Sequence, residues 1–290
     1  MKYTRVIYIV TVLMFQLITS GERVGLPEKN VISLENNAFD DQYVGCEDKM
    51  KMWAKKLLDQ EREKDLNFNK VWEKAEKEWE SMSTEKKTME KPFEIAVIAY
   101  TMDENMFYKD FNQAVRECCK SREAYMNNFH FKAFHFYLTR ALQILRGPCY
   151  NVYRGVSVKQ YPDGTREMRF GQFASTSFYE NVARNFANGS GTFYKVYTCK
   201  GAKIEHLSVF PHEKEVLIPP YEVFTVSSFS DFEYLKKFEV KSNGIFSKFN
   251  CAYLEAPGNK AVGPGQLTTI FFSGVFTLVF QAHSQLLTGF

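Results

Sequence analysis

The sequence contains few of the residues that proteins use to hold metal ions. Its 290 residues include 5 histidines, and no two of them stand at the spacing of zinc ligands. It has 6 cysteines, yet no two of these are separated by two residues as in the common zinc motifs. We therefore expect no metal site in this protein.

The chain also lacks a strong charge of either sign. Lysine and arginine number 37 against 34 aspartate and glutamate residues, so the formal net charge is +3. Removal of the two cations nearest the N-terminus, Lys2 and Arg5, lowers it to about +1. Without a basic surface, nucleic acid is not an expected partner. The aromatic content of 16% favours a packed globular core over disorder.

The apolar run near the N-terminus is too short to span a bilayer, which takes about 20 apolar residues. It covers residues 6–18, follows Lys2 and Arg5, and precedes Thr19-Ser20-Gly21. A basic start, an apolar centre and small residues at the end are typical of a secretory signal peptide. We therefore predict a cleaved signal at residues 1–21, the alternative being a buried N-terminal helix.

The C-terminal segment carries no charge after Lys260 and is strongly apolar over residues 267–280. Small residues precede it, among them Gly258 and Ala261. A small residue, a spacer and an apolar tail are the order of a glycosylphosphatidylinositol (GPI) anchor signal. We predict such a signal at residues 257–290, with plain secretion as the alternative. In both cases we expect an extracellular protein that meets a membrane only through a lipid.

Cysteines in a secreted chain are expected to form disulfides. The six are Cys46, Cys118, Cys119, Cys149, Cys199 and Cys251. Six cysteines allow many pairings, and their spacing alone does not choose among them. One glycosylation sequon, Asn188-Gly189-Ser190, is consistent with the secretory route.

Residues 22–147 show the periodicity of helices. Apolar residues recur at helical spacing among lysines and glutamates, as in Met50, Trp53 and Leu57. A wider apolar stripe over residues 131–145 predicts a core helix that ends at Gly147-Pro148.

Residues 148–256 show the period of two that is typical of strands. Val152, Arg154 and Val156 fall on one face of the first strand, and residues 192–198 are β-branched and aromatic. Glycine and proline turn signals separate the short runs. A helical half followed by a β-rich half predicts an α+β fold.

Three local features of the β-rich half are suited to chemistry. Arg154 lies in mid-strand, where its guanidinium fork suits a phosphate, although an edge strand would leave it in water. The hydroxyls of Phe173-Ala174-Ser175-Thr176-Ser177-Phe178 suit a polar ligand, but an ordinary strand has the same pattern.

The third feature is the sequence Glu213-Lys214-Glu215. In an extended chain, residues i and i+2 project to the same side, so both carboxylates would face one way. Paired carboxylates raise each other's pKa and can divide charge stabilisation from proton transfer. A solvated charge cluster is the alternative for such a motif standing alone.

In this order the three features resemble the Arg–Ser–Glu pattern of the clostridial-toxin-like ADP-ribosyltransferases. The closest likeness is to the vertebrate ecto-ADP-ribosyltransferases, which modify arginine. The similar stretches are Val152-Tyr153-Arg154-Gly155-Val156, Phe170-Gly171-Gln172-Phe173-Ala174-Ser175-Thr176-Ser177 and Glu213-Lys214-Glu215-Val216-Leu217-Ile218-Pro219-Pro220. The resemblance covers residues 46–251. It implies a helical lobe, residues 22–147, packed on a β-sandwich core, residues 148–256, with NAD in the cleft between them.

The resemblance also implies roles for single residues in holding NAD. Arg154 would hold the NAD phosphates, and the backbone of Gly155 would bond the nicotinamide amide. Ser175 would fix the nicotinamide end and orient the catalytic carboxylate. Phe186 would stack on the nicotinamide ring, with core packing as the alternative for this side chain.

The two glutamates would then divide the chemistry. Glu215 would stabilise the positive charge that develops on the ribose as nicotinamide leaves. Glu213 would orient the acceptor guanidinium and accept its proton, and glutamate at this position goes with arginine acceptors in the family. The expected function is transfer of ADP-ribose from NAD to arginines of extracellular proteins. The alternatives are an NAD glycohydrolase and a non-catalytic recognition protein on the same fold.

The family pattern further implies disulfides between Cys46 and Cys251 and between Cys149 and Cys199. Cys118 and Cys119 lie outside that pattern. Adjacent cysteines rarely bond each other comfortably, so a free thiol and an intermolecular disulfide are both alternatives there, and the sequence leaves the state of these two residues open. We also expect a monomer.

Overall fold

The structure is a computed structural model that describes residues 30–103, 106–231 and 234–254. The predicted signal peptide at residues 1–21 and the predicted anchor signal at residues 257–290 lie outside these ranges. All described residues belong to one compact unit, which ends at Leu254. Within the described ranges, no helix is both long enough and apolar enough to cross a bilayer.

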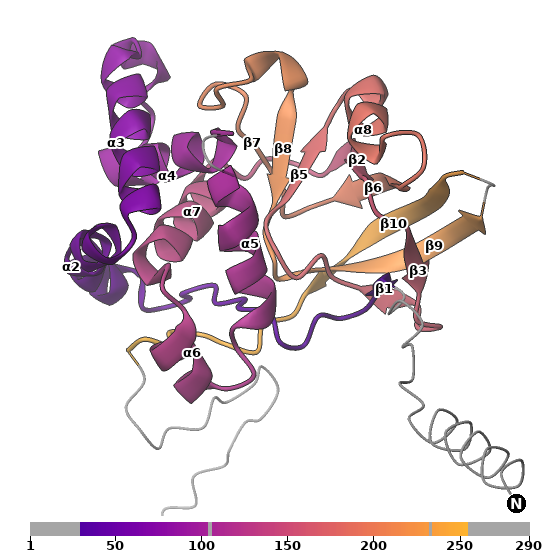
Figure 1. The fold of residues 1–290 in the computed structure, drawn as a ribbon, viewed down its shortest axis with the longest axis horizontal. Coiled ribbons are helices and arrows are strands. Elements are labelled where there is room, and N and C mark those ends of the chain that lie inside the picture. The colour runs from indigo at the N-terminus through magenta and orange to yellow at the C-terminus, as the bar shows by residue number, and fades with distance from the viewer. Residues whose placement is uncertain (1–29, 104–105, 232–233, 255–290) are drawn as a thin grey trace, which may run out of the picture. The chain divides into compact units, whose positions relative to one another are not determined.

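Helices dominate the first half of the described chain (Figure 1). They are α2 (Glu47–Lys64), α3 (Leu66–Ser81), the 3-10 turn η1 (Thr84–Lys86), α4 (Lys91–Thr101), α5 (Phe107–Glu117), α6 (Arg122–Asn128) and α7 (Lys132–Leu145). Asp65 separates the first two, because its side chain accepts hydrogen bonds from the backbone of Asn67 and Phe68 and so caps α3. Helix α4 begins with Pro92 in its first turn, and all of its residues from Phe93 to Tyr100 are buried. It is therefore the central helix of this half.

The predicted apolar face of α2 is partly wrong. Met50 and Leu57 are buried as expected, but Trp53 is 44% exposed and packs edge-on against Tyr253. The buried face instead runs through Ala54, because the helix turns by about 100° per residue and the i+4 position lies closer to the core here. The predicted core helix is confirmed as α7, which ends two residues before Gly147.

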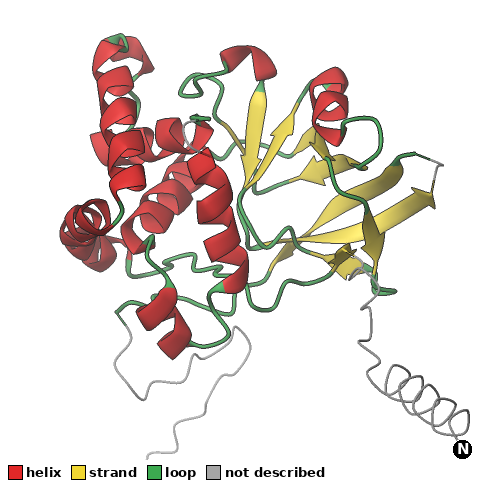
Figure 2. Ribbon diagram, in the orientation of Figure 1, coloured by secondary structure: helices red, strands yellow, loops and turns green. Residues whose placement is uncertain are grey.

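The strands follow in the second half (Figure 2). They are β2 (Tyr150–Val156), β3 (Gln160–Pro162), β4 (Glu167–Met168), β5 (Ala174–Ser177), β6 (Thr192–Thr198), β7 (Ala202–Lys203), β8 (Glu215–Ile218), β9 (Glu222–Asp231) and β10 (Lys236–Ile245), with β1 (Asn30–Ile32) from the N-terminal side. Helix α8 (Glu180–Ala187) and the 3-10 turn η3 (Pro211–Glu213) lie between strands. The long sheet has the order β4-β9-β10-β6-β2-β5-β8-β7, and β1 pairs with β3 beside it.

One weak joint divides the long sheet into two parts. Strands β2 and β5 share a single residue pair, Tyr153 with Ser177, whereas β2 and β6 pair along seven residues. The two parts pack around one apolar cluster, with Val152 and Val196 from one part and Val216 and Ile218 from the other. The long sheet is therefore continuous but narrow between β2 and β5, and one apolar core joins the two parts. The α+β arrangement expected from the sequence is confirmed.

The helical half packs on the sheet through aromatic side chains. Phe173, just before β5, stacks on Phe111 of α5 with ring centroids 5.5 Å apart. It also contacts Tyr100 of α4 at 6.1 Å. The start of β5 is thereby fixed against two helices, which places the following residues at the junction of the two halves.

Two buried aspartates tie the ends of the described chain together. Asp40 accepts hydrogen bonds from the backbone of Lys248 and Phe249 and forms an ion pair with the buried Arg169 at 2.6 Å. Asp41 accepts from the backbone of Cys251 at 2.9 Å. Burial raises the pKa of Asp41 to about 6. These bonds hold the N-terminal and C-terminal segments side by side.

The two disulfides implied by the resemblance are present. Cys46 bonds Cys251, and Cys149 bonds Cys199. The sequence left the state of the adjacent pair open, and in the structure Cys118 and Cys119 bond each other. Cys119 is fully buried, so its sulfur is out of reach of another chain and the neighbouring thiol is its available partner.

Candidate active site

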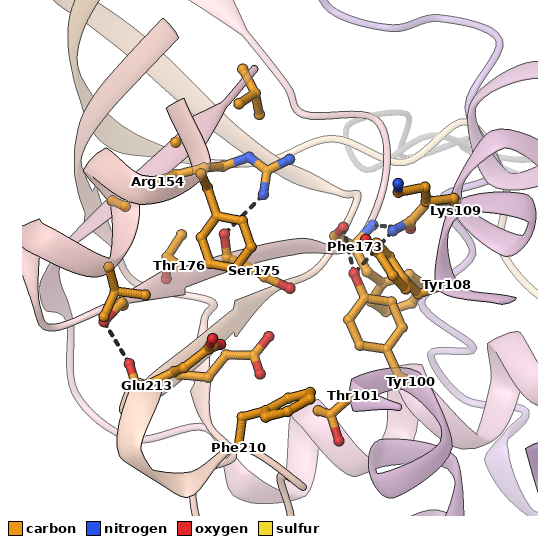
Figure 3. A pocket seen from close by; sticks show the side chains of 18 of the residues that line it. Tyr100, Thr101, Tyr108, Lys109, Arg154, Phe173, Ser175, Thr176, Phe210 and Glu213 are labelled. Atoms are coloured by element: carbon orange, nitrogen blue, oxygen red, sulfur yellow. Dashed lines mark hydrogen bonds between the residues drawn. The ribbon is translucent and has the colours of Figure 1, made fainter. Parts of the chain in front are cut away.

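A cleft of about 670 Å³ opens where the helical half meets the sheet (Figure 3). Its walls come from α4 and α5 on one side and from β2, β5, α8 and η3 on the other. All the residues proposed from the sequence line it, namely Arg154, Gly155, Ser175, Phe186, Glu213 and Glu215. The fold thus brings Gly155 and Glu215, which are 60 positions apart in the chain, into the same cleft.

Arg154 is half-buried in the middle of β2 and is held from two sides. Its Nη1 donates a hydrogen bond to the backbone oxygen of Ser175 at 2.8 Å. Its guanidinium lies over the ring of Phe170, 5.5 Å from the centroid. Burial lowers the pKa of Arg154 from its ordinary value, yet an arginine stays charged in proteins. The alternative of a strand arginine in open water does not hold.

Ser175 is the exposed residue of β5, between the buried Ala174 and Thr176. Alternation along the strand exposes its hydroxyl to the cleft, whereas the buried Thr176 hydroxyl donates to the backbone oxygen of Val216. The Ser175 side chain also hydrogen-bonds the carboxylate of Glu215 and lowers its pKa. Ser175 therefore connects the arginine end of the cleft with the carboxylate end.

Glu215 is the first residue of β8 and is 7% exposed. The pKa of this carboxyl group is raised to about 7, mainly by burial and also by the charge of Glu213, while Ser175 and Arg154 act in the opposite direction. A carboxyl group that titrates near neutral pH and points into a cleft is a common mark of an active site.

Glu213 lies close by, but not in the conformation expected from the sequence. It ends the 3-10 turn η3, and Lys214 then adopts a left-handed conformation with φ of 50°. The interpretation of residues 213–215 as one extended strand was therefore wrong, since the strand begins only at Glu215. Both glutamates nevertheless line the cleft, one on each side of the left-handed Lys214. Partial burial raises the pKa of Glu213.

Gly155 lets helix α8 lie directly on strand β2. A Cβ atom at this position would come within 1.7 Å of the backbone oxygen of Ala183 and within 2.7 Å of the backbone nitrogen of Ala187. Because both contacts are backbone atoms, any side chain here would push α8 away from the sheet. The glycine therefore sets the position of α8 in the cleft wall.

Phe186 is carried by α8 and is 55% exposed. Together with Val182, one turn earlier, it faces the cleft, while Ala183 and Ala187 face the sheet. Core packing, the alternative for Phe186, is excluded by this exposure. The ring is free to contact a ligand.

The helical half contributes cleft residues that were not predicted from the sequence, among them Tyr100, Thr101, Tyr108, Lys109 and Asn112. Figure 3 shows Tyr100, Tyr108 and Lys109 opposite Arg154 and Glu213. A signal existed for Asn112. Asn112 is 4% exposed and stands on the apolar stripe of α5 with Phe111 and Val115, and a polar residue on such a stripe must have a buried partner.

The cleft thus combines a fixed cation with a buried anion. Arg154 suits the phosphates of a nucleotide, and Glu215 suits a positive charge that develops in a reaction. Among the residues that the structure describes, no group of three or more histidine, cysteine, aspartate or glutamate side chains is arranged to hold a metal ion. The arrangement favours a nucleotide substrate in which positive charge develops on one of the separating groups as a bond breaks.

Comparisons with known proteins agree on one family. A sequence profile described as NAD:arginine ADP-ribosyltransferase matches residues 32–245. Ecto-ADP-ribosyltransferase 5 of Bos taurus is 42% identical over 287 residues, which cover 92% of this chain and 90% of that protein. Its counterpart in Rattus norvegicus is 45% identical, over 77% of this chain and 76% of that one. A crystal structure of a mutant of the eukaryotic mono-ADP-ribosyltransferase ART2.2 in complex with NAD aligns with a TM-score of 0.67 and 35% identity, over 77% of this chain and 99% of that one.

Proposed function

Because this chain belongs to the NAD:arginine ADP-ribosyltransferase family, we propose that its cleft holds NAD between Arg154 and Glu215 while an arginine approaches Glu213. The protein is an enzyme that transfers ADP-ribose from NAD to arginine side chains and releases nicotinamide. NAD is its substrate. Its acceptors are proteins at the cell surface or outside the cell, as for the relatives named ecto-enzymes.

At the phosphate end, Arg154 holds the NAD diphosphate. Its bond to the Ser175 backbone and its contact with Phe170 fix the guanidinium before the substrate arrives. Such preorganisation lowers the entropic cost of binding. The remaining N–H groups of the guanidinium are available for phosphate oxygens.

At the nicotinamide end, the ligand lies against β2 and α8. The backbone of Gly155 bonds the amide of the nicotinamide, since no side chain stands in the way there. Phe186 stacks on the ring, for which its exposed face is suited. The Ser175 hydroxyl completes this end and keeps Glu215 in position.

Glu215 stabilises the transition state of bond cleavage. When the bond between nicotinamide and ribose breaks, positive charge develops on the ribose, and a nearby carboxylate stabilises it more than it stabilises neutral ground-state ribose. The low polarity around this buried side chain strengthens the interaction. Only the ionised carboxylate can act in this way.

Glu213 handles the acceptor. A free guanidinium is protonated and a poor nucleophile. A carboxylate orients it through two parallel hydrogen bonds and takes its proton as the new bond to ribose forms. Glu213 is more exposed than Glu215, as a group that meets a large protein acceptor must be.

The observation that carries this proposal is the presence of both glutamates in one cleft with Arg154 and Ser175. The test uses the secreted chain, residues 22–256, with labelled NAD and the arginine mimic agmatine. We expect an agmatine adduct from the unaltered protein, neither adduct nor nicotinamide release from Glu215→Gln, and from Glu213→Gln loss of transfer with some hydrolysis left. Nicotinamide release without any adduct from the unaltered protein would instead indicate an NAD glycohydrolase, and failure to bind NAD would indicate a recognition protein.

We further propose that the chain is held at the cell surface by a GPI anchor added after removal of residues 257–290, and that it acts as a monomer. The order of small residues, spacer and apolar tail supports the anchor. Treatment of expressing cells with phosphatidylinositol-specific phospholipase would release the enzyme, whereas a freely secreted form would already be in the medium. Sedimentation of the released protein would give the mass of one chain.

A further inference from the structure

The segment that carries Glu213 is bonded to hydroxyl groups at both of its ends. At the start of the segment, the backbone N–H of Val209 donates to Thr101 Oγ1 at 3.2 Å. At its end, Ser177 Oγ donates to the backbone oxygen of Glu213 at 2.5 Å. One hydroxyl belongs to the helical half and the other to the sheet, so the segment connects the two walls of the cleft.

Thr101 offers a fixed acceptor. It is the last residue of α4, and its hydroxyl donates to the backbone oxygen of Ile98 at 2.9 Å. That bond uses the hydrogen of the hydroxyl and leaves its lone pairs for Val209. The bond to Ile98 holds the rotamer of Thr101, and the buried residues before it hold α4, so the oxygen has a defined position. Figure 3 shows Thr101 next to Phe210, on the side of the cleft that faces Glu213.

Inside the segment, local hydrogen bonds connect Val209 with Glu213, so that the position of Val209 affects that of Glu213. Ser208 Oγ accepts from the backbone of Phe210 at 3.1 Å, and the backbone oxygen of Phe210 accepts from the N–H of Glu213 at 3.0 Å. The left-handed Lys214 then turns the chain into β8. A shift at Val209 therefore reaches Glu213 through one turn of 3-10 helix.

Glu215 is held differently. It lies in β8, where it is paired with Ser177 of β5, and its position does not depend on Val209. We propose that Thr101 is a positioning residue for Glu213 and thereby determines how ADP-ribose is divided between an arginine acceptor and water. The inference rests on the proposed function of the two glutamates.

The physical reason is that the two acceptors, a guanidinium and water, differ in how much they depend on the position of Glu213. A guanidinium must be oriented and deprotonated by Glu213, and misplacement of a catalytic group by about 1 Å can cost up to roughly a hundredfold in rate. Water needs no such orientation and is present at high concentration. Loss of the Thr101 hydroxyl would therefore slow transfer while cleavage of NAD, which depends on Glu215, continues.

The test measures adduct formation and nicotinamide release in the same reactions with NAD and agmatine. For Thr101→Val we expect the ratio of adduct to nicotinamide to fall about tenfold and the KM for agmatine to rise, with the KM for NAD unchanged. Thr101→Ser keeps the hydroxyl and restores the ratio. Thr165→Val removes a hydroxyl that bonds Asp163 and the backbone of Glu167 in a turn away from the cleft, and it leaves the ratio unchanged.

Several results would overturn the inference. An unaltered ratio in Thr101→Val, an equal loss of both products, or failure of Thr101→Ser to restore the ratio would each do so. Thermal unfolding of each variant shows whether the fold is intact, and the ratio is insensitive to the fraction of folded enzyme. If the unaltered protein itself forms no adduct, the proposed function fails first and the role of Thr101 falls with it.

Discussion

The side-chain amide of Asn112 donates a hydrogen bond to the hydroxyl of Tyr100 at 3.0 Å. Both residues also bond the backbone of Phe173, because Tyr100 donates to its oxygen at 2.9 Å and its N–H donates to Asn112 Oδ1 at 3.1 Å. Burial raises the pKa of Tyr100 to about 12, so its hydroxyl keeps the proton. This ring of three bonds joins two helices to the start of the strand that carries Ser175.

Replacement of Asn112 by alanine should therefore weaken the fold and the site together. Asn112→Ala leaves the buried N–H of Phe173 without its acceptor and removes the bond that the Tyr100 hydroxyl accepts, so this hydroxyl keeps only its bond to the backbone oxygen of Phe173. We expect the free energy of unfolding to fall by about 2–3 kcal/mol and the KM for NAD to rise. Urea unfolding and steady-state kinetics measure the two effects. Gln113→Ala, one residue further on and exposed, is the matched control and should change neither.

The activity should depend on the ionisation of Glu215. Burial raises the pKa of its carboxyl group to about 7, and only the carboxylate stabilises positive charge on the ribose. We expect kcat/KM for NAD in the free enzyme to rise with pH through an apparent pKa near 7. A profile that is flat between about pH 5 and 8 would contradict this assignment.

The raised pKa of Glu215 should also make the stability of the folded protein depend on pH. Between the ordinary pKa of glutamate and about 7, the folded protein binds a proton at Glu215 that the unfolded chain has lost. The contribution of this group to stability is therefore largest at acid pH and decreases as the pH rises through that range. We expect Glu215→Gln to be inactive but more heat-stable than the unaltered protein at pH 8, with the difference smaller near pH 5. Calorimetry at both pH values provides the comparison.

Gly155 should not tolerate even a methyl group. In Gly155→Ala the new Cβ would collide with the backbone of α8, so the helix must move and take Phe186 with it. We expect a loss of about 1–3 kcal/mol in unfolding free energy and a marked rise in the KM for NAD. Asn151→Ala, on an exposed position of the same strand, should leave both unchanged. Normal NAD kinetics in Gly155→Ala would show that α8 does not depend on this contact.

The sequon at Asn188 should carry a glycan without harm to activity. Asn188 is exposed and caps the end of α8 in a left-handed conformation, and it is not among the residues that line the cleft. We expect glycosidase treatment of the secreted protein to lower its apparent mass and Asn188→Gln to abolish that shift. Transfer to agmatine should be the same in both forms. A faster reaction after deglycosylation would mean that the glycan does reach the cleft.

The parts of the site that sequence reasoning found are those encoded in short stretches of chain. Arg154 and Ser175 each stand in a strand whose alternation is visible in the sequence, and their order along the chain carries the family resemblance. Asn112 and Thr101 act across 61 and 108 positions, on Phe173 and Val209, and nothing local marks such partners. Lys214 misled the interpretation of its motif because lysine seldom adopts a left-handed backbone. The turn it makes is imposed by the surrounding bonds.

The last described residues pack against the helical half. Arg122 of α6 donates to the backbone oxygen of Ala252 at 2.7 Å, and Tyr253 lies against Trp53. In Figure 1 this yellow segment runs along the foot of the helices, near α6, while the orange turn before β8 is at the opposite, upper side. If the proposed anchor is attached shortly after Leu254, the attachment point follows the segment near α6, on the side of the described fold opposite the turn that carries Glu213. With such an anchor, Glu213 would lie on the side of the enzyme that is farther from the lipid, where a protein acceptor can approach it.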